Sequence, residues 1–245
     1  MKAADAFQQF FRHWLAATRS FSRIPVPASL QEAGARPEPS AAVRHLPGVG
    51  LLVGLAACML FAIVSLPLPQ GPLTPLVAAV AATIATVTLT GALHEDALLR
   101  DVGVVVLVLV LAAKLSLLGV LGLHSPAGVL AALLAAHAVS RFWVVLVAYG
   151  LPHVGGAPRD PLAHPVDGRG LAVAGAWCAA PLLVMVLAGG VTFVLVALIA
   201  STVTHVVLRR RLQRRLGGFT PDSLGSAQQV TEVAFYLGAA FGVGR

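Results

Sequence analysis

The sequence predicts an all-α fold, a polytopic integral membrane helix bundle, because of its composition and its repeated apolar runs. Hydrophobic residues make up 58% of the chain and charged residues only 11%, whereas a soluble domain carries about 25% charged residues. Runs of about 20 apolar residues, the length that a helix needs to span a bilayer, recur between joints rich in Pro and Gly. We therefore expect residues 1–245 to form a single membrane-embedded domain.

The first expected element is an amphipathic interfacial helix at 4–20, lying on the bilayer surface. Phenylalanine, tryptophan and leucine recur there at helical spacing, with glutamine, arginine and histidine between them. The part of the chain from 48 to 243 is expected to form a transmembrane bundle of about six to seven helices. Gly189 and Gly190 are the expected turn in an apolar run that is too long for one span. The candidate spans are 48–66, 73–93, 102–123, 127–150, 171–188, 190–208 and 226–243.

Lysine and arginine predict the orientation, because short cytoplasmic loops carry an excess of both. Arginines cluster before the first candidate span and after the sixth, whereas the joints near 67–72 and 124–126 contain neither residue type. The N-terminal arm and the stretches 94–101, 156–169 and 209–225 are therefore expected to face the cytoplasm. The net charge of +7 comes with only 6% aromatic residues, which favours basic loops beside anionic lipid and no nucleic acid partner.

A polar stretch, LTGALHEDALLRDVG, interrupts two apolar segments. It places His94, Glu95 and Asp96 side by side at the end of the second span, and Asp101 follows within two helical turns. Adjacent carboxylates repel unless a cation or base compensates them, and their oxygens are ligands that Mg²⁺ prefers. The alternative is a solvated helix end. The H-E-x-x-H pattern of zinc proteases is absent from the sequence.

Lys114 and Arg141 lie inside predicted spans. A charge at that depth costs about 2.5–3.5 kcal/mol on insertion scales, so such residues usually face a bundle interior or a cavity. A cationic pair beneath an acidic site would suit phosphate and metal, and snorkelling to the membrane surface is the alternative. His137 shares a helix face with Arg141 and is interpreted as a packing residue rather than a ligand. Glu232, inside the last span, also needs a compensating partner.

The stretch RRRLQRRLGGFTPDSLGSAQQVTE is the other dense group of polar residues. Its arginines alone are typical of a positive-inside signal. Gly217 and Gly218 allow the backbone to approach a ligand closely. Thr220 and Asp222 are suited either to cap the following helix or to bind phosphate and metal.

Four blocks of the sequence resemble the motifs of the cobalamin (5'-phosphate) synthase family, also called the adenosylcobinamide-GDP ribazoletransferases. The blocks are Ser20–Pro27 (SFSRIPVP), Arg44–Gly54 (RHLPGVGLLVG), Gly91–Leu98 (GALHEDAL) and Leu216–Ser226 (LGGFTPDSLGS). Glu232 follows the last block at the spacing of the family pattern. The blocks are distributed over nearly the whole length of the chain, and their order and spacing make the set more specific than any block alone.

The resemblance implies a Mg²⁺-dependent phosphotransferase that acts in the last assembly step of cobalamin biosynthesis. Its members transfer the adenosylcobinamide phosphate moiety from adenosylcobinamide-GDP to α-ribazole or its 5'-phosphate, giving adenosylcobalamin (5'-phosphate) and GMP. A multi-pass protein of the bacterial inner membrane with a cytoplasmic active face is implied, and homo-oligomerisation is left open.

The resemblance also assigns roles to residues of this chain. Glu95 and Asp96 are expected to hold Mg²⁺, with Asp101 and Asp222 as further ligands. His94 is expected to orient a carboxylate or to assist removal of the proton from the attacking hydroxyl. The residues expected to contact phosphate or substrate are Arg23, Arg44, Lys114, Arg141, Gly217, Gly218 and Thr220.

This chain departs from the family pattern at three places. Ala97 and Pro221 each replace a glycine of the family motifs. The acidic segment that follows H-x-D in the family is absent, because ALLRDVG leads directly into the next apolar run. If the gene carries this deletion, we predict little or no transfer, since part of the metal-holding shell is missing.

Two other functions fit some of the same features. CDP-alcohol phosphatidyltransferases also place acids at the end of a membrane helix, but their D-G-x-x-A-R signature is not found here. A small transporter could use Lys114 and Arg141 for an anionic substrate. A transporter would gather its charges near the middle of the bilayer, whereas the transferase would gather them at the cytoplasmic face.

Overall fold

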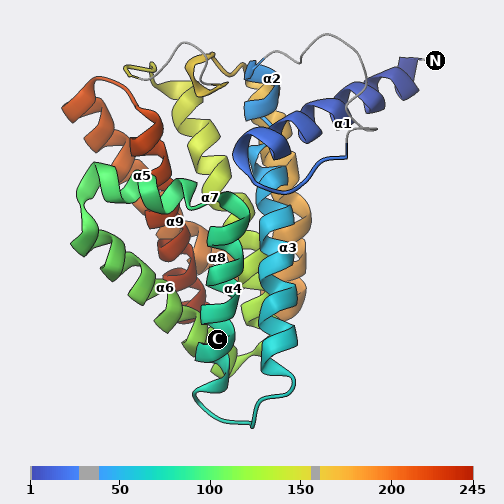
Figure 1. The fold of residues 1–245 in the computed structure, drawn as a ribbon, viewed down its shortest axis with the longest axis vertical. Coiled ribbons are helices and arrows are strands. Elements are labelled where there is room, and N and C mark those ends of the chain that lie inside the picture. The colour runs from blue at the N-terminus through green and yellow to red at the C-terminus, as the bar shows by residue number, and fades with distance from the viewer. Residues whose placement is uncertain (1, 28–38, 156–160, 245) are drawn as a thin grey trace.

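A computed structural model describes residues 2–27, 39–155 and 161–244 of the chain, and these ranges confirm the all-α fold (Figure 1). They contain an isolated β-bridge between His153 and Phe219 but no strand. The helices are α1 (Lys2–Phe21), α2 (Pro39–Val43), α3 (Leu46–Ser65), α4 (Thr74–Thr90), α5 (Leu93–Val102), α6 (Val104–His124), α7 (Pro126–Gly150), α8 (Gly168–Leu216) and α9 (Pro221–Gly242), with a 3₁₀ turn η2 at Pro161–Ala163.

Length and composition identify the helices that can cross a membrane. Within the described ranges, four helical segments qualify, and they are Ala41–Ser65, Val104–His124, Pro126–Gly150 and Gly168–Leu216. The pair α4 and α5 counts as a fifth, bent by 90° at its break. The bend separates the second predicted span from the polar stretch, which forms a helix of its own. We therefore describe α5 as a short helix set across the end of α4 (Figure 1).

The 49-residue helix α8 accounts for two passes. At 1.5 Å per residue it would be roughly 73 Å long if it were straight, more than twice the hydrocarbon core of about 30 Å. Gly190, with φ 82° and ψ 175°, breaks it. Before the break Trp177 packs on Gly48 at the start of α3, and after it Arg209 lies against Gly150 at the end of α7. The chain thus turns back on itself, which confirms the break expected at Gly189–Gly190.

The seventh predicted span, 226–243, does not meet the same test of length and apolar composition. It corresponds to α9, which is polar in its first half and packs between α5, α6, α7 and α8. Gln228, Gln229 and Glu232 on this helix are all buried. These polar side chains lie inside the protein rather than at its surface, so the weak apolar signal of this segment has a structural reason.

The predicted amphipathic helix is confirmed as a helix, α1, which lies across one end of the bundle (Figure 1). Part of its aromatic face packs on protein. Phe10 and Trp14 stack on Trp177 of α8, with ring centroids 5.5 and 5.7 Å apart, whereas Phe7 is 70% exposed. The contact with the bilayer therefore stays a prediction for the exposed remainder of that face.

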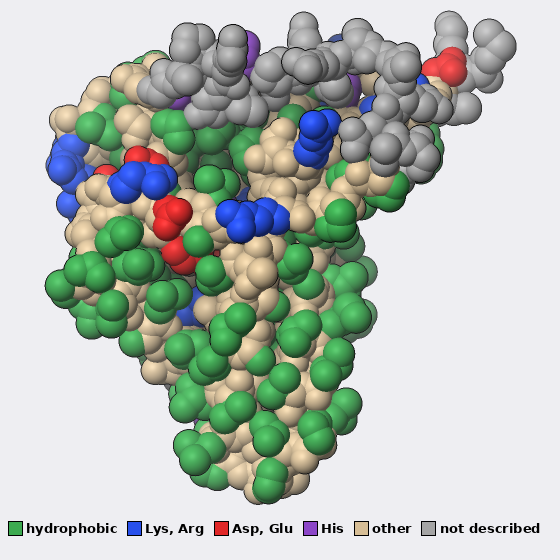
Figure 2. All heavy atoms as spheres, in the orientation of Figure 1, with side chains coloured by type: hydrophobic (Ala, Val, Ile, Leu, Met, Phe, Trp, Pro, Cys, Tyr) green, Lys and Arg blue, Asp and Glu red, His purple; other side chains and the backbone are tan. Residues whose placement is uncertain are grey.

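Charged side chains gather toward the end of the molecule where α5 lies, while the surface around the other end is hydrophobic (Figure 2). This one-sided distribution on the visible face agrees with the prediction that the polar stretches share one side of the bundle. A polar site is therefore expected at the charged end of the bundle.

Candidate functional site

Residues from all four motif blocks line one cavity, which we call the motif pocket. It has a volume of about 230 Å³ and lies among α1, α3, α5, α7, η2 and α9. The block residues that line it include Ser20, Leu46, His94, Ala97, Asp222 and Gly225. Segments that are far apart in the sequence therefore meet at one place, as expected of motifs that serve one site.

The two substituted positions, Ala97 and Pro221, both line the motif pocket. Ala97 also lies directly against Gly225 of α9, where even one added carbon on the glycine would collide with the Ala97 methyl group. In this chain α5 and α9 are thus in close contact at the pocket wall, and Ala97 supplies a methyl group where the family motif has none.

Arg23 and Arg44, the arginines of the first two motif blocks, contact other parts of the protein. Arg23 follows α1 at the bend of α4 and α5, where its backbone N–H donates to the carbonyl oxygen of Leu89 at 2.7 Å. Its guanidinium packs against Gly91. Arg44 donates to the Ala41 carbonyl at 3.2 Å and lies 3.1 Å from Nδ1 of His13. Burial and the charge of Arg44 lower the pKa of His13.

The adjacent polar residues of α5 point in different directions. His94 and Glu95 are buried, whereas Asp96 and Asp101 are exposed. Glu95 accepts a hydrogen bond of 2.6 Å from the side-chain amide of Gln229 on α9. Successive residues on a helix are rotated by about 100° around its axis. The face of α5 that packs on the bundle therefore includes Glu95, while the following residue, Asp96, points outward. The consecutive acids therefore do not form one cluster.

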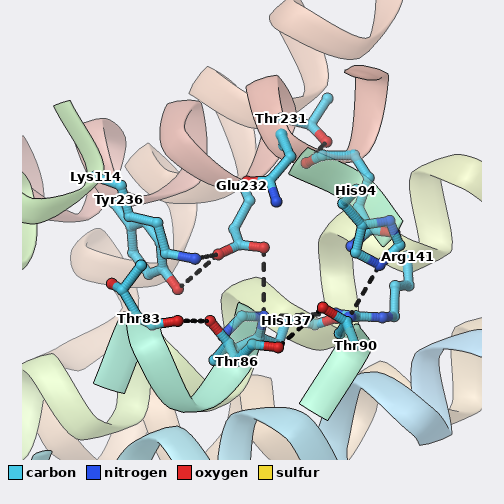
Figure 3. Close-up of polar contacts among 12 residues, drawn as sticks. Thr83, Thr86, Thr90, His94, Lys114, His137, Arg141, Thr231, Glu232 and Tyr236 are labelled. Atoms are coloured by element: carbon cyan, nitrogen blue, oxygen red, sulfur yellow. Dashed lines mark hydrogen bonds and ion pairs between the residues drawn. The ribbon is translucent and has the colours of Figure 1, made fainter. Parts of the chain in front are cut away.

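Beneath α5, residues of α6, α7 and α9 form a buried polar network around Glu232 (Figure 3). The carboxylate of Glu232 lies 2.7 Å from Nζ of Lys114 and 3.3 Å from Nδ1 of His137, and it accepts a 3.3 Å hydrogen bond from the Tyr236 hydroxyl. The side chains of Lys114, His137 and Glu232 are each only 2% exposed. Lys114 thus faces the interior as predicted, but its charge already has a protein partner.

Arg141 connects this network to the motif pocket. Its Nη1 donates to the His137 carbonyl oxygen at 2.9 Å, and its Nη2 lies 3.4 Å from Nε2 of His94. The interior location predicted for Arg141 is confirmed, since it is 1% exposed. Glu232, His137 and Gln229 were not among the predicted site residues. Glu232 and His137 carried a signal in the sequence, an ionisable group within an apolar span. Gln229 was one of several uncharged polar residues in its segment, and nothing distinguished it from them.

The last motif block has local structural roles. Thr220 caps α9, because its hydroxyl accepts from the Ser223 N–H at 3.2 Å while the Ser223 hydroxyl accepts from the Thr220 N–H at 2.9 Å. Gly217 ends α8 in the left-handed region at φ 69°. Gly218 lies so close to the Pro152 carbonyl oxygen that no side chain would fit. The close approach that we expected for a ligand is therefore made to the chain's own backbone.

Asp222 is paired with Arg100. The guanidinium forms a fork on the carboxylate, with Nη2 2.8 Å from Oδ1 and Nε 3.0 Å from Oδ2. Arg100 belongs to α5 and Asp222 to the first turn of α9, so the pair joins the two helices at the rim of the motif pocket.

The predicted magnesium ligands do not converge in the described part of the chain. No group of three or more His, Cys, Asp or Glu residues there could hold a metal ion. Glu95 points into the bundle and bonds to Gln229, Asp96 and Asp101 point outward, and Asp222 bonds to Arg100. The four-residue site expected from the sequence is therefore not assembled by protein side chains alone.

The fold and the motif pocket define a multi-spanning helical membrane protein with a polar site at one end of its bundle. A model of the family described as cobalamin-5-phosphate synthase matches residues 13–99 and 101–240. The chain therefore belongs to the cobalamin-5-phosphate synthase family. This membership confirms the resemblance seen in the motifs, and it does not favour a CDP-alcohol phosphatidyltransferase or a transporter.

Relatives agree with the family match. The chain is 39% identical to an adenosylcobinamide-GDP ribazoletransferase of Polaromonas naphthalenivorans, with 95% of this chain and 98% of the relative covered. It is 31% identical to an enzyme of the same name from Shewanella amazonensis, with 95% and 96% covered. No solved structure matches the chain.

The family match is interrupted at Arg100. The alignment with the Polaromonas naphthalenivorans relative extends over 273 positions, more than the 245 residues of the whole chain, so that relative contains residues that this chain lacks. The interruption lies where the acidic segment of the family pattern is absent. Arg100, the residue at this junction, is the one that pairs with Asp222.

Proposed function

We propose that this protein transfers the adenosylcobinamide phosphate moiety from adenosylcobinamide-GDP to α-ribazole or its 5'-phosphate, releasing GMP, at the cytoplasmic face of a bacterial inner membrane. The observation that carries the proposal is the convergence of the four motif blocks on one pocket. The names of relatives that cover 95% of the chain support the choice of substrates.

Such a transfer requires positioning and charge neutralisation more than covalent help from the protein. The ribazole hydroxyl forms a bond to the phosphorus attached to cobinamide, and the bond from that phosphorus to the bridging oxygen breaks. The bridging oxygen leaves with GMP, and the hydroxyl proton passes to solvent water. His94 lines the motif pocket, and Arg141 lies at its Nε2. If Arg141 donates to Nε2, the ring proton of His94 is on Nδ1, which can then donate to a phosphate oxygen.

The proposal includes Mg²⁺, bound by one or two carboxylates together with the substrate rather than by a complete set of protein ligands. Magnesium is usually bound by one or two carboxylates together with waters and the phosphates of a substrate. Asp96 and Asp101 are exposed on α5 and are the carboxylates open to such an ion. Because these side chains do not form a complete metal site, we assign no step of the reaction to the ion.

The test is GMP release by the protein in lipid nanodiscs, with the Polaromonas naphthalenivorans relative prepared in the same way as control. We expect little release by this chain, at a rate far below that of the control because the acidic segment is missing, and this release should require both substrates. Insertion of the relative's additional residues at Arg100 is expected to raise the rate. If the relative is active and both forms of this chain release no GMP, the proposal is wrong.

A further inference from the structure

A second cavity, larger than the motif pocket, lies among α5, the start of α6, the second half of α8 and α9, and we call it the lateral groove. Its volume is about 460 Å³. Its apolar lining includes Val102 at the end of α5, Val106 of α6, and Leu208 and Leu212 of α8. Buried residues of α9 such as Ala227 also contribute. None of the residues that we placed in the motif pocket lines it.

The lateral groove extends from the apolar part of the bundle toward its charged end. Val106 and Leu208 belong to segments that are long and apolar enough to span a membrane. Val106 is also part of the exposed apolar surface of α6. A ligand of this groove must therefore match apolar walls at one end and a polar environment at the other, as an amphipathic molecule of the bilayer does.

Two arginines stand at the polar end of the groove. Arg211 and Arg215 both line it, and their spacing of four residues places them on one face of α8. Among the described residues neither forms an ion pair. Asp101 of α5 also lines the groove. Two cations and one carboxylate leave one net positive charge, which is suited to a singly charged anion, and paired guanidinium groups are suited to phosphate.

The positive-inside rule explains why arginines are frequent at this end of α8, but it does not explain which of them line a cavity. Arg209, Arg210 and Arg214 belong to the same cluster and do not line the groove. Arg209 instead donates to the carbonyl oxygen of Gly150 at 3.3 Å. Arg210 and Arg214, which have the same spacing on the same helix, can therefore serve as controls for Arg211 and Arg215.

We propose that the lateral groove binds one anionic phospholipid, with its phosphate on Arg211 and Arg215 and an acyl chain between α6 and α8. The lipid would also support the site, because α5 and α9 form part of both cavities. On α5, Ala97 faces the motif pocket and Leu98 the groove. This inference goes beyond the proposed function and depends only on the membrane location of the helices.

Native mass spectrometry of the full chain, purified in detergent with added phosphatidylglycerol or phosphatidylcholine, tests the proposal. We expect one tightly bound phosphatidylglycerol on the wild type and at least tenfold weaker binding after Arg211→Gln with Arg215→Gln. The matched control, Arg210→Gln with Arg214→Gln, removes the same charge from the same helix and should keep the lipid. Equal loss in both double variants, or equal binding of phosphatidylcholine by the wild type, contradicts the proposal.

A second pair of variants tests the apolar walls without changing charge. Val106→Trp fills the groove and is expected to weaken phosphatidylglycerol binding about as much as the loss of the two arginines does. Leu109→Trp is its control, because Leu109 is 62% exposed on the same helix and does not line the groove. Unchanged binding in Val106→Trp would mean that lipid is held at the surface by charge alone. A mass that showed a second chain instead of lipid would equally overturn the proposal.

Discussion

At the scale of single residues, Lys114 and Glu232 depend on each other. They are 2.7 Å apart and their side chains are 2% exposed. Glu232→Gln would leave the ammonium of Lys114 buried without its counter-charge, and breaking a buried pair in this way typically costs about 3–5 kcal/mol. We expect a clear drop in the midpoint of thermal unfolding in nanodiscs.

The exposed Asp101→Asn is the control for this prediction, since its effect should be small. The double variant Lys114→Met with Glu232→Leu removes both charges and should recover most of the lost stability. A Glu232→Gln protein as stable as the wild type would show that the pair does not hold the helices together.

Arg100 and Asp222 form an exposed pair with a different expected role. Their side chains are 55% and 41% exposed, so the pair should contribute little to stability. Arg100→Gln frees the Asp222 carboxylate beside Asp96, which also attracts the guanidinium. We therefore expect stronger Mn²⁺ binding, measured by electron paramagnetic resonance, with little change in thermal stability.

The addition of Asp222→Asn to the Arg100→Gln protein is expected to remove the gained binding. Mn²⁺ affinity that is the same in Arg100→Gln and the wild type would contradict the idea that the arginine occupies a cation position. Both measurements are independent of turnover.

At the scale of elements, the bend between α4 and α5 determines where the motif residues lie. Ala92 adopts φ 58° and ψ 18° there, the left-handed region that costs an alanine roughly 1–2 kcal/mol. Ala92→Gly should relieve this cost and raise the thermal midpoint. Ala112→Gly, within the regular helix α6, is the control and should lower it, because glycine destabilises a helix interior by roughly 0.5–1 kcal/mol. A lower midpoint for Ala92→Gly would mean that the bend is not strained.

At the scale of the whole molecule, the fold places α5 and the start of α9 at one end of the bundle and the joint between α3 and α4 at the other (Figure 1). Single cysteines at Asp96, Asp222 and Gly71, in a chain whose Cys58 and Cys178 are replaced by alanine, test this with a membrane-impermeant maleimide. We expect Asp96→Cys and Asp222→Cys to react in inside-out vesicles and Gly71→Cys in intact cells. Labelling of positions 96 and 222 from opposite sides would be incompatible with the motif pocket.

The sequence alone determined the fold class, the break near Gly190 and the interior location of Lys114 and Arg141. These follow from composition and length, because a bilayer accepts only helices of sufficient apolar length and turns charges inward. It also placed the four motif blocks in one site by resemblance, and the family match confirms that family.

Only the tertiary structure decided which polar groups meet. Lys114, His137 and Glu232 belong to three different helices, and no spacing within one helix relates them. The 90° bend sets α5 across the end of α4, and the packing of α5 on the bundle buries Glu95 and leaves Asp96 exposed. Asp222, which was expected to bind metal, forms an ion pair with Arg100. The physical reason is that the hydropathy of a segment reports its environment, whereas the rotation and packing of whole helices determine the partner of each side chain.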